Sequence, residues 1–191
     1  MAVTVVDNNI LTNNNNNVLD FQPYQAPANV IPASSWTQVG SAIWSPYMTY
    51  YIHQAYVYNT YYYKASEAQY VANAFPGWHL PTSSDFQYLK DYTAPSGAYK
   101  LKTTSGWLFG NGNDQYGFGW KRLGFYQNPG TSNDFFASNC PIWGSTVSSS
   151  PIGESRVCLA VIDNSIDYPE PIFENRDIFH MYIPVRLVKD S

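Results

Sequence analysis

The sequence predicts an α+β fold in which two short helices precede a strand-rich half with long loops. Two local signals place the helices. Ser66 can cap a helix that runs to about Ala74, because Pro76 ends it soon afterwards. Thr82 and Asp85 have the spacing of a capping box, so a second helix is expected to start there. The chain after these helices is rich in Gly, Asn, Ser and aromatic residues, which favours turns and strands.

The chain divides into an arm, residues 1–35, and a domain, residues 36–191. In the arm, an Asn run at 13–17 and repeated Pro disfavour helix and regular sheet. The other arm residues are more apolar than a free linker needs, and without a partner they would be exposed to water. We therefore expect an extended N-terminal arm that docks on a partner or on a second copy of the chain. A disordered leader is the alternative.

At the start of the domain, residues 36–63 are β-rich and crowded with Tyr, and the alternation at 55–58 predicts a strand. The two helices that follow should each bury one apolar face. The residues expected to point inward are Ala68, Val71, Ala72, Phe86, Leu89 and Tyr92.

Residues 106–151 contain no long periodic run, which predicts a long-loop region. Strands are expected to return at 157–162 and again from Ile178 to Val188. Pro184 lies inside the last of these and cannot donate a hydrogen bond to a ladder. It therefore indicates a bulge or an edge position.

The composition favours contact with other molecules through uncharged side chains. Charged residues make up 13% of the chain and aromatic residues 17%, so the surface is polar through Asn, Ser, Thr and Tyr rather than through ions. Tyr supplies a large contact area at small entropic cost, which suits adhesion. The net charge is −4 and the basic residues are scattered, so we expect no nucleic-acid partner. No run of eighteen apolar residues exists, and we expect no membrane insertion.

No catalytic residue, metal site or cofactor is predicted. A Ser nucleophile needs a His base held by a third group, and the three widely separated His show no such context. The acidic residues between Asp163 and Asp177 surround a turn, which favours a solvated loop. A calcium site is the alternative there, because hard cations need several oxygen ligands close together.

The chain has two cysteines, Cys140 and Cys158. Two buried, unpaired thiols are the favoured interpretation, because free Cys is often buried and a protein assembled inside a cell meets reducing conditions. A disulfide is the alternative. A zinc site is not expected, since the cysteines and histidines lack ligand spacing.

Four blocks carry a resemblance to a known family: GWHLPT at 77–82, KLKTTSGW at 100–107, YGF at 116–118 and VRLVKD at 185–190. In this order they resemble a FISUMP-type domain, the major paralogous domain of certain fibre-degrading and gut bacteria. The resemblance covers about residues 60–190. The chain departs from the pattern at Leu187, where the family usually has Cys, and residues 135–138 match only loosely an aromatic block of the family.

This resemblance implies a C-type-lectin-like fold and a surface-exposed binding module. By the same resemblance, Trp78 and Trp107 are packing residues of the core, and Phe118 is also expected to be buried. In folds of this kind the long loops bind ligands, and aromatic rings beside amide groups grip sugars or peptides. Six candidate ligand-binding residues lie in these loops: Asn111, Asn113, Asp114, Tyr116, Trp120 and Trp143. For each aromatic residue among them, burial in the core is the alternative.

Together these features predict a non-enzymatic structural and adhesion protein on the surface of a phage virion, such as a head fibre, a decoration protein or a tail-adhesion component. We expect it to be made in the host cytoplasm, because Met1–Asp7 shows no secretory signal. Residues 1–35 would attach it to other virion structural proteins. A homo-oligomer, dimer or trimer, is expected, with a host surface glycan or receptor as a further partner. The host, a gut bacterium of the Bacteroidota type, follows by analogy from where the family occurs.

Two alternatives belong to other classes. The first is an exported carbohydrate-binding domain on the surface of a bacterial cell, with its signal peptide absent from this sequence. The second is an enzyme on the same broad fold, a hydrolase or a formylglycine-generating type, which would need an active site that the sequence does not display.

Overall fold

The computed structural model has an α+β architecture with antiparallel sheets and short helices, which confirms the predicted fold class at this level. It describes residues 3–6, 10–13, 37–45, 62–127, 135–150, 153–163 and 168–191. The strand predicted at 55–58 and most of the predicted arm lie outside these ranges.

The helices of the described chain are α1 (Ala65–Asn73), α2 (Ser83–Thr93) and α3 (Gly97–Leu101). The second helix starts as predicted: Thr82 is the N-cap residue, and the Thr82 hydroxyl accepts a hydrogen bond from the Asp85 N–H at 3.2 Å. The first helix starts earlier than predicted, with Lys64 rather than Ser66 as its N-cap. The short α3 was not predicted, because its N-terminus is capped by a distant residue, Glu170, which accepts hydrogen bonds from the N–H groups of residues 96 and 97.

The strands form four antiparallel sheets within the described chain. One is the hairpin of β1 (Val3–Val6) and β2 (Ile10–Asn13), inside the predicted arm. A three-stranded sheet has the order β11-β10-β9 and comprises β9 (Asn139–Ser150), β10 (Gly153–Ile162) and β11 (Ile172–Asp177). A four-stranded sheet in the order β5-β12-β7-β8 contains β5 (Tyr62–Tyr63), β7 (Phe125–Gln127), β8 (Phe135–Phe136) and β12 (Met181–Pro184). The last, in the order β3-β4-β13-β6, contains β3 (Thr37–Val39), β4 (Ala42–Trp44), β6 (Trp78–His79) and β13 (Val188–Lys189).

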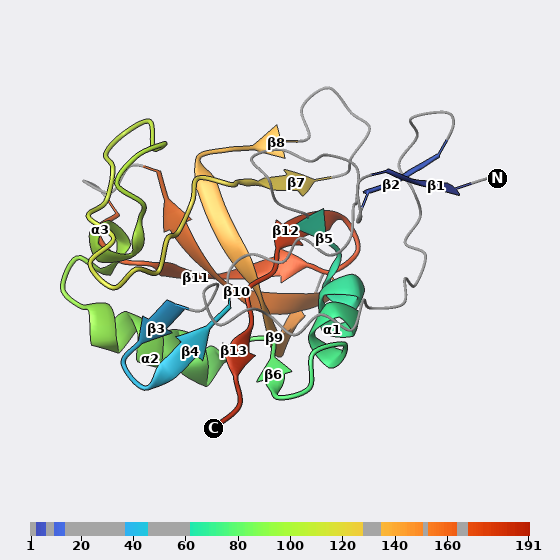
Figure 1. Cartoon of the computed structure of the whole chain (residues 1–191), viewed down its shortest axis with the longest axis horizontal. Helices are drawn as coiled ribbons and strands as arrows, with labels where there is room; N and C mark the ends of the chain where they lie inside the picture. Colours follow the sequence, from blue (N-terminus) through green and yellow to red (C-terminus); the bar gives the residue numbers. More distant parts are fainter. Residues whose placement is uncertain are drawn as a thin grey trace.

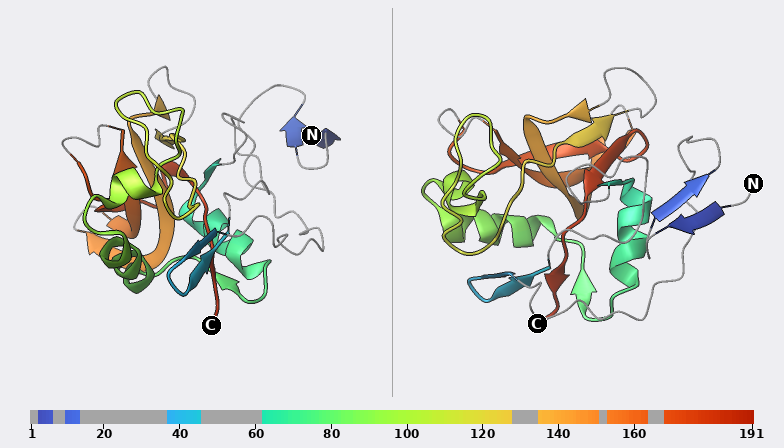
Figure 2. Two further views of the ribbon diagram at one scale, coloured as in Figure 1. Left: turned by 60° about the vertical axis from the view of Figure 1, so that its left-hand side comes forward. Right: turned by 45° about the horizontal axis from the view of Figure 1, so that its top comes forward.

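The long strands β9 and β10 separate two hydrophobic clusters. Their register pairs Cys158 with Trp143, and both side chains belong to the cluster that packs against α1. The next pair, Leu159 with Ile142, belongs to the cluster that packs against α2 and α3. Since neighbouring residues of a strand point to opposite faces, one ribbon supplies both cores. Figures 1 and 2 accordingly show α1 on one side of this ribbon and α2 with α3 on the other.

The predicted helix faces are confirmed except at one residue. Ala68, Val71, Ala72, Phe86 and Leu89 are all buried. Tyr92 was expected to face the core, and this was wrong, because 43% of its surface is exposed. The polar end of a Tyr ring allows it to remain on a helix surface at little cost.

Two strand predictions need correction. Residues 106–151 were predicted to be loop, yet β9 occupies Asn139–Ser150 and is the longest strand described. The predicted strand from Ile178 to Val188 is in fact two strands, because β12 ends at Pro184 and the chain then crosses to another sheet, where β13 begins. Pro184 therefore marks the end of a strand rather than a bulge within one.

Both cysteines are buried and free, as the favoured interpretation expected. Burial is the main cause that raises the pKa of the Cys140 thiol to about 12, and burial also raises the pKa of Cys158. The two thiols therefore behave as small apolar side chains at neutral pH.

Glu67 makes the stability of the fold depend on pH. Its side chain is 2% exposed, and burial raises its pKa to about 7, although the hydrogen bond from the Lys64 N–H opposes this. The folded chain therefore favours the protonated form of Glu67. The contribution of protonated Glu67 to the stability of the fold is complete below the ordinary pKa of 4.5 and is lost as the pH rises through 7. We expect Glu67→Gln, which stays neutral, to gain roughly 2–3 kcal/mol of stability relative to the native chain between about pH 5 and pH 8.

Urea denaturation at the two pH values measures this difference. Glu154→Gln is the matched control, because it makes the same change at a Glu that is exposed on β10 rather than buried. A Glu67→Gln variant whose relative stability is the same at both pH values would contradict the assignment.

Candidate functional site

The predicted ligand-binding residues do not form one surface. Trp120 is 1% exposed and Trp143 is 0% exposed, and they belong to different hydrophobic clusters. Each indole N–H is already used, by the Cys140 carbonyl at 3.1 Å for Trp120 and by the Tyr63 carbonyl at 2.6 Å for Trp143. The prediction that these two rings contact a ligand therefore disagrees with their positions in the fold, where they are packing residues.

The other four predicted residues lie in the loop after α3. Asn111 and Asn113 are exposed, and Asp114 and Tyr116 are half-buried. The side chains of Asn111 and Asp114 point into the loop itself: Asn111 accepts a hydrogen bond from the Trp107 N–H at 3.1 Å, and Asp114 accepts one from the Gly119 N–H at 2.7 Å. These two side chains therefore fix the shape of the loop. Asn113 is exposed, whereas Tyr116 packs against the cluster of α2 and α3.

Of the aromatic residues expected in the core, Trp107 is 7% exposed and Phe118 is 1% exposed, which confirms both. Trp78 is only partly buried, and it packs against the edge of the α1 cluster.

A buried ion-pair network holds the loop to the domain. The Lys102 ammonium lies 4.3 Å from the centre of the Trp107 ring and donates to the Asp163 carbonyl at 2.6 Å. The Asp163 carboxylate, 1% exposed, accepts from Arg122 at 2.6 Å and from the N–H of Leu108 at 3.0 Å. Burial is the main cause that lowers the pKa of Lys102 to about 8, and the charge of Asp163 opposes it. This network makes the loop a rigid part of the surface.

Acidic residues predicted to surround a turn instead have separate structural roles. Asp163 anchors the loop, Glu170 caps α3, Glu174 pairs with Arg176, and Asp177 pairs with His180. Nowhere in the described chain do three or more His, Cys, Asp or Glu gather as metal ligands would. These pairings supply no support for the calcium alternative.

Three tyrosines form a continuous row along α2 and the loop, in which two rings are exposed and the third, Tyr116, is half-buried. The rings of Tyr88 and Tyr92, one helical turn apart, are stacked with 6.2 Å between centroids, and Tyr116 of the loop lies 5.2 Å from Tyr92. Tyr88 and Tyr92 are each 43% exposed. We call Tyr88, Tyr92 and Tyr116 the tyrosine row. Of these three residues, only Tyr116 was predicted from the sequence; the spacing of Tyr88 and Tyr92 on a polar helix face was the signal for the other two.

The first tyrosine of the row is held by the β3–β4 turn. The Tyr88 hydroxyl lies 3.4 Å from both the N–H and the hydroxyl of Ser41. These hydrogen bonds are the main cause that lowers the pKa of Tyr88. Gly40 has φ +59°, and a Cβ on it would overlap the Tyr88 hydroxyl. Glycine is therefore needed at this turn both for the backbone conformation and for the approach of the ring.

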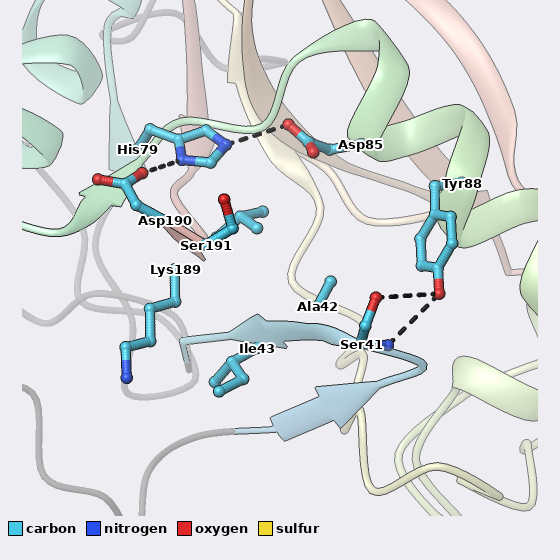
Figure 3. A pocket seen from close by; sticks show the side chains of 10 residues that line it. Ser41, Ala42, Ile43, His79, Asp85, Tyr88, Lys189, Asp190 and Ser191 are labelled. Atoms are coloured by element: carbon cyan, nitrogen blue, oxygen red, sulfur yellow. Dashed lines mark hydrogen bonds and ion pairs between the residues drawn. The ribbon is translucent and has the colours of Figure 1, made fainter.

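Beside Tyr88 lies a cavity of about 410 Å³ between the β3–β4 hairpin, the start of α2 and the end of the chain. On its wall the imidazole of His79 bridges two carboxylates: Nδ1 lies 2.6 Å from Asp190 and Nε2 lies 3.1 Å from Asp85 (Figure 3). Burial disfavours ionisation of Asp85, but hydrogen bonds from Thr82 and His79 outweigh it and lower the pKa of this carboxyl. We call this cavity the His79 pocket.

The pocket is built by strand pairing between distant segments. Val188 of β13 pairs with Trp44 of β4 on one side and with His79 of β6 on the other. The Asp190 N–H donates to the Gly77 carbonyl at 2.8 Å, which continues this pairing past the end of the strand. The pocket wall is therefore preformed and does not depend on loop closure.

Comparison of the chain with family models, with curated proteins and with solved structures gives no match. The resemblance to a FISUMP-type domain therefore stays a prediction that depends on the four sequence blocks. None of the helices described is long and apolar enough to span a bilayer.

Proposed function

We propose that the chain is a non-enzymatic binding protein on the surface of a phage virion, a head fibre, decoration or tail-adhesion component with a C-type-lectin-like domain of the FISUMP type. The observation that carries the binding role is the tyrosine row, which presents three aromatic rings on a helix and a braced loop. Aromatic groups held rigidly at a surface are typical anchors of adhesive contacts, because little entropy is lost on binding.

The environment of His79 in its pocket favours binding over catalysis. A general base needs a ring nitrogen that can take a proton from a substrate or a nucleophile. Both nitrogens of His79 face carboxylates, so neither is open to that task. The low charge and high Tyr content of the chain support the same conclusion.

Replacing the central tyrosine of the row tests the adhesive role. We expect Tyr92→Ala to weaken binding of the purified protein to Bacteroidota cells about tenfold, because a contact anchor contributes roughly 1–2 kcal/mol. Flow cytometry with labelled protein measures the binding. Tyr70→Ala is the matched control, since Tyr70 is a 37% exposed tyrosine on α1, at the other end of the domain.

If the Tyr92→Ala and Tyr70→Ala variants bind cells equally well, the tyrosine row has no adhesive role. Immunogold labelling then separates the two possible locations of the protein. Labelled virions would support the proposal, whereas labelled bacterial surfaces without phage would favour the exported carbohydrate-binding domain.

The arm is proposed to attach the domain to other virion proteins, and self-association as a dimer or trimer would multiply weak contacts. Deleting residues 1–30 should leave the unfolding temperature of the domain unchanged but abolish its incorporation into particles. Calorimetry and blotting of purified virions measure the two properties. Full incorporation of the truncated chain would contradict this part of the proposal.

A further inference from the structure

We propose that the His79 pocket binds a neutral, hydroxyl-rich ligand, a saccharide unit, and that the tyrosine row extends this site along α2. The inference deepens the proposed adhesive function and depends on it. It is based on the hydrogen-bonding groups, the apolar lining and the size of the pocket.

The two carboxylates of the pocket each keep one oxygen for a ligand. A single oxygen of Asp85, Oδ2, accepts from the Thr82 N–H, the Thr82 hydroxyl and His79, at 2.8, 2.7 and 3.1 Å. Asp190 likewise uses Oδ1 for His79. Among the described residues none donates to Oδ1 of Asp85 or Oδ2 of Asp190. Two fixed acceptors joined by one imidazole suit the hydroxyl groups of a sugar ring, which donate hydrogen bonds and carry no charge.

The remaining groups match the other features of a sugar. The hydroxyls of Tyr88 and Ser41 can both donate and accept, as sugar hydroxyls do (Figure 3). Ala42, Ile43 and Val188 add apolar surface, against which the C–H face of a sugar can lie. Because Tyr88 both lines the pocket and begins the tyrosine row, a longer chain of sugars can continue over the rings of Tyr92 and Tyr116.

The size of the pocket suits a small sugar. The volume of about 410 Å³ lies in the range of small-ligand pockets and is sufficient for a mono- or disaccharide.

The test uses the full chain and a panel of neutral mono-, di- and oligosaccharides, with binding followed by NMR shifts of the backbone N–H groups. At least one saccharide should shift the signals of Ser41, Ile43 and Asp190. Asp190→Asn and Tyr88→Phe should each weaken that binding at least fivefold. Asp177→Asn is the matched control, because Asp177 also pairs with a His at the surface, His180 at 2.8 Å, but does not line the pocket.

Three results would overturn the inference: no saccharide of the panel shifts the pocket signals; Asp190→Asn binds as the native chain does; or arginine methyl ester, a cationic probe, binds there and the saccharides do not. Thermal melting of each variant shows whether a loss of binding comes from unfolding. Cell binding separates this inference from the adhesive role. If Tyr92→Ala reduces adhesion while Asp190→Asn does not, the adhesive function is retained and the saccharide site is wrong.

Discussion

Trp143→Ala should lower the free energy of unfolding by about 3–5 kcal/mol, the cost expected for removing a large aromatic side chain from a core. The ring of Trp143 is fully buried against Cys158 in the α1 cluster, so its removal leaves a cavity that neighbouring strands cannot fill. It also leaves the Tyr63 carbonyl without its 2.6 Å hydrogen bond. Urea denaturation of the native chain and the variant measures the difference.

Trp143→Phe provides a second measurement if the alanine variant does not fold. It keeps most of the apolar contact and loses the indole N–H, so the expected cost is smaller, on the order of 1–3 kcal/mol. Tyr92→Ala is the surface control and should cost less than about 1 kcal/mol. A Trp143→Ala variant that is as stable as the native chain but does not bind cells would restore Trp143 as a ligand-binding residue.

The first two helices could be predicted because their signals are local. Thr82 and Asp85 lie three residues apart, and a capping box needs no other part of the chain. The N-cap of α1 was misplaced because Lys64 is not a residue type that normally caps a helix. In its place Glu67 accepts the hydrogen bond of the Lys64 N–H, which is visible only once the helix is built.

The burial of Trp120 and Trp143 could not be predicted from local pattern. The alternation of apolar and polar residues in β9 is concealed by Pro141, Gly144 and the serines of 145–150. The region was therefore interpreted as loop. Gly144 is needed there because a Cβ would overlap the Val157 carbonyl of the neighbouring strand. The same glycine that permits close packing of the sheet thus weakened the strand signal in the sequence.

The His79 pocket depends on pairings between segments far apart in sequence. His79 and Asp190 are 111 residues apart, and they meet because β13 pairs with both β4 and β6. No sequence spacing connects them, and the resemblance to a known family assigned His79 only to a conserved-looking block. The geometry that brings an imidazole between two carboxylates becomes apparent only with the strand register.

Asp163→Ala should destabilise the domain by about 3–5 kcal/mol, which is the usual cost of removing one partner of a buried ion pair. Arg122 would lose its carboxylate at 2.6 Å while only 21% of its side chain is exposed. The N–H groups of Leu108 and Phe109 would lose their acceptor, although both side chains are exposed at the loop tip. Amide hydrogen exchange at these two residues should therefore accelerate at least tenfold, and urea denaturation measures the overall loss.

Removing the charge of Arg122 as well should restore part of the stability lost in Asp163→Ala. The double variant Asp163→Ala with Arg122→Met removes the Arg122 cation and leaves only Lys102 without the Asp163 charge, so we expect it to recover about 1–2 kcal/mol relative to Asp163→Ala alone. Exchange at residues 108 and 109 should remain fast in the double variant, because the acceptor for their N–H groups is still missing. If the single variant exchanged as slowly as the native chain, the loop would be held by other contacts, and its rigidity could not be attributed to Asp163.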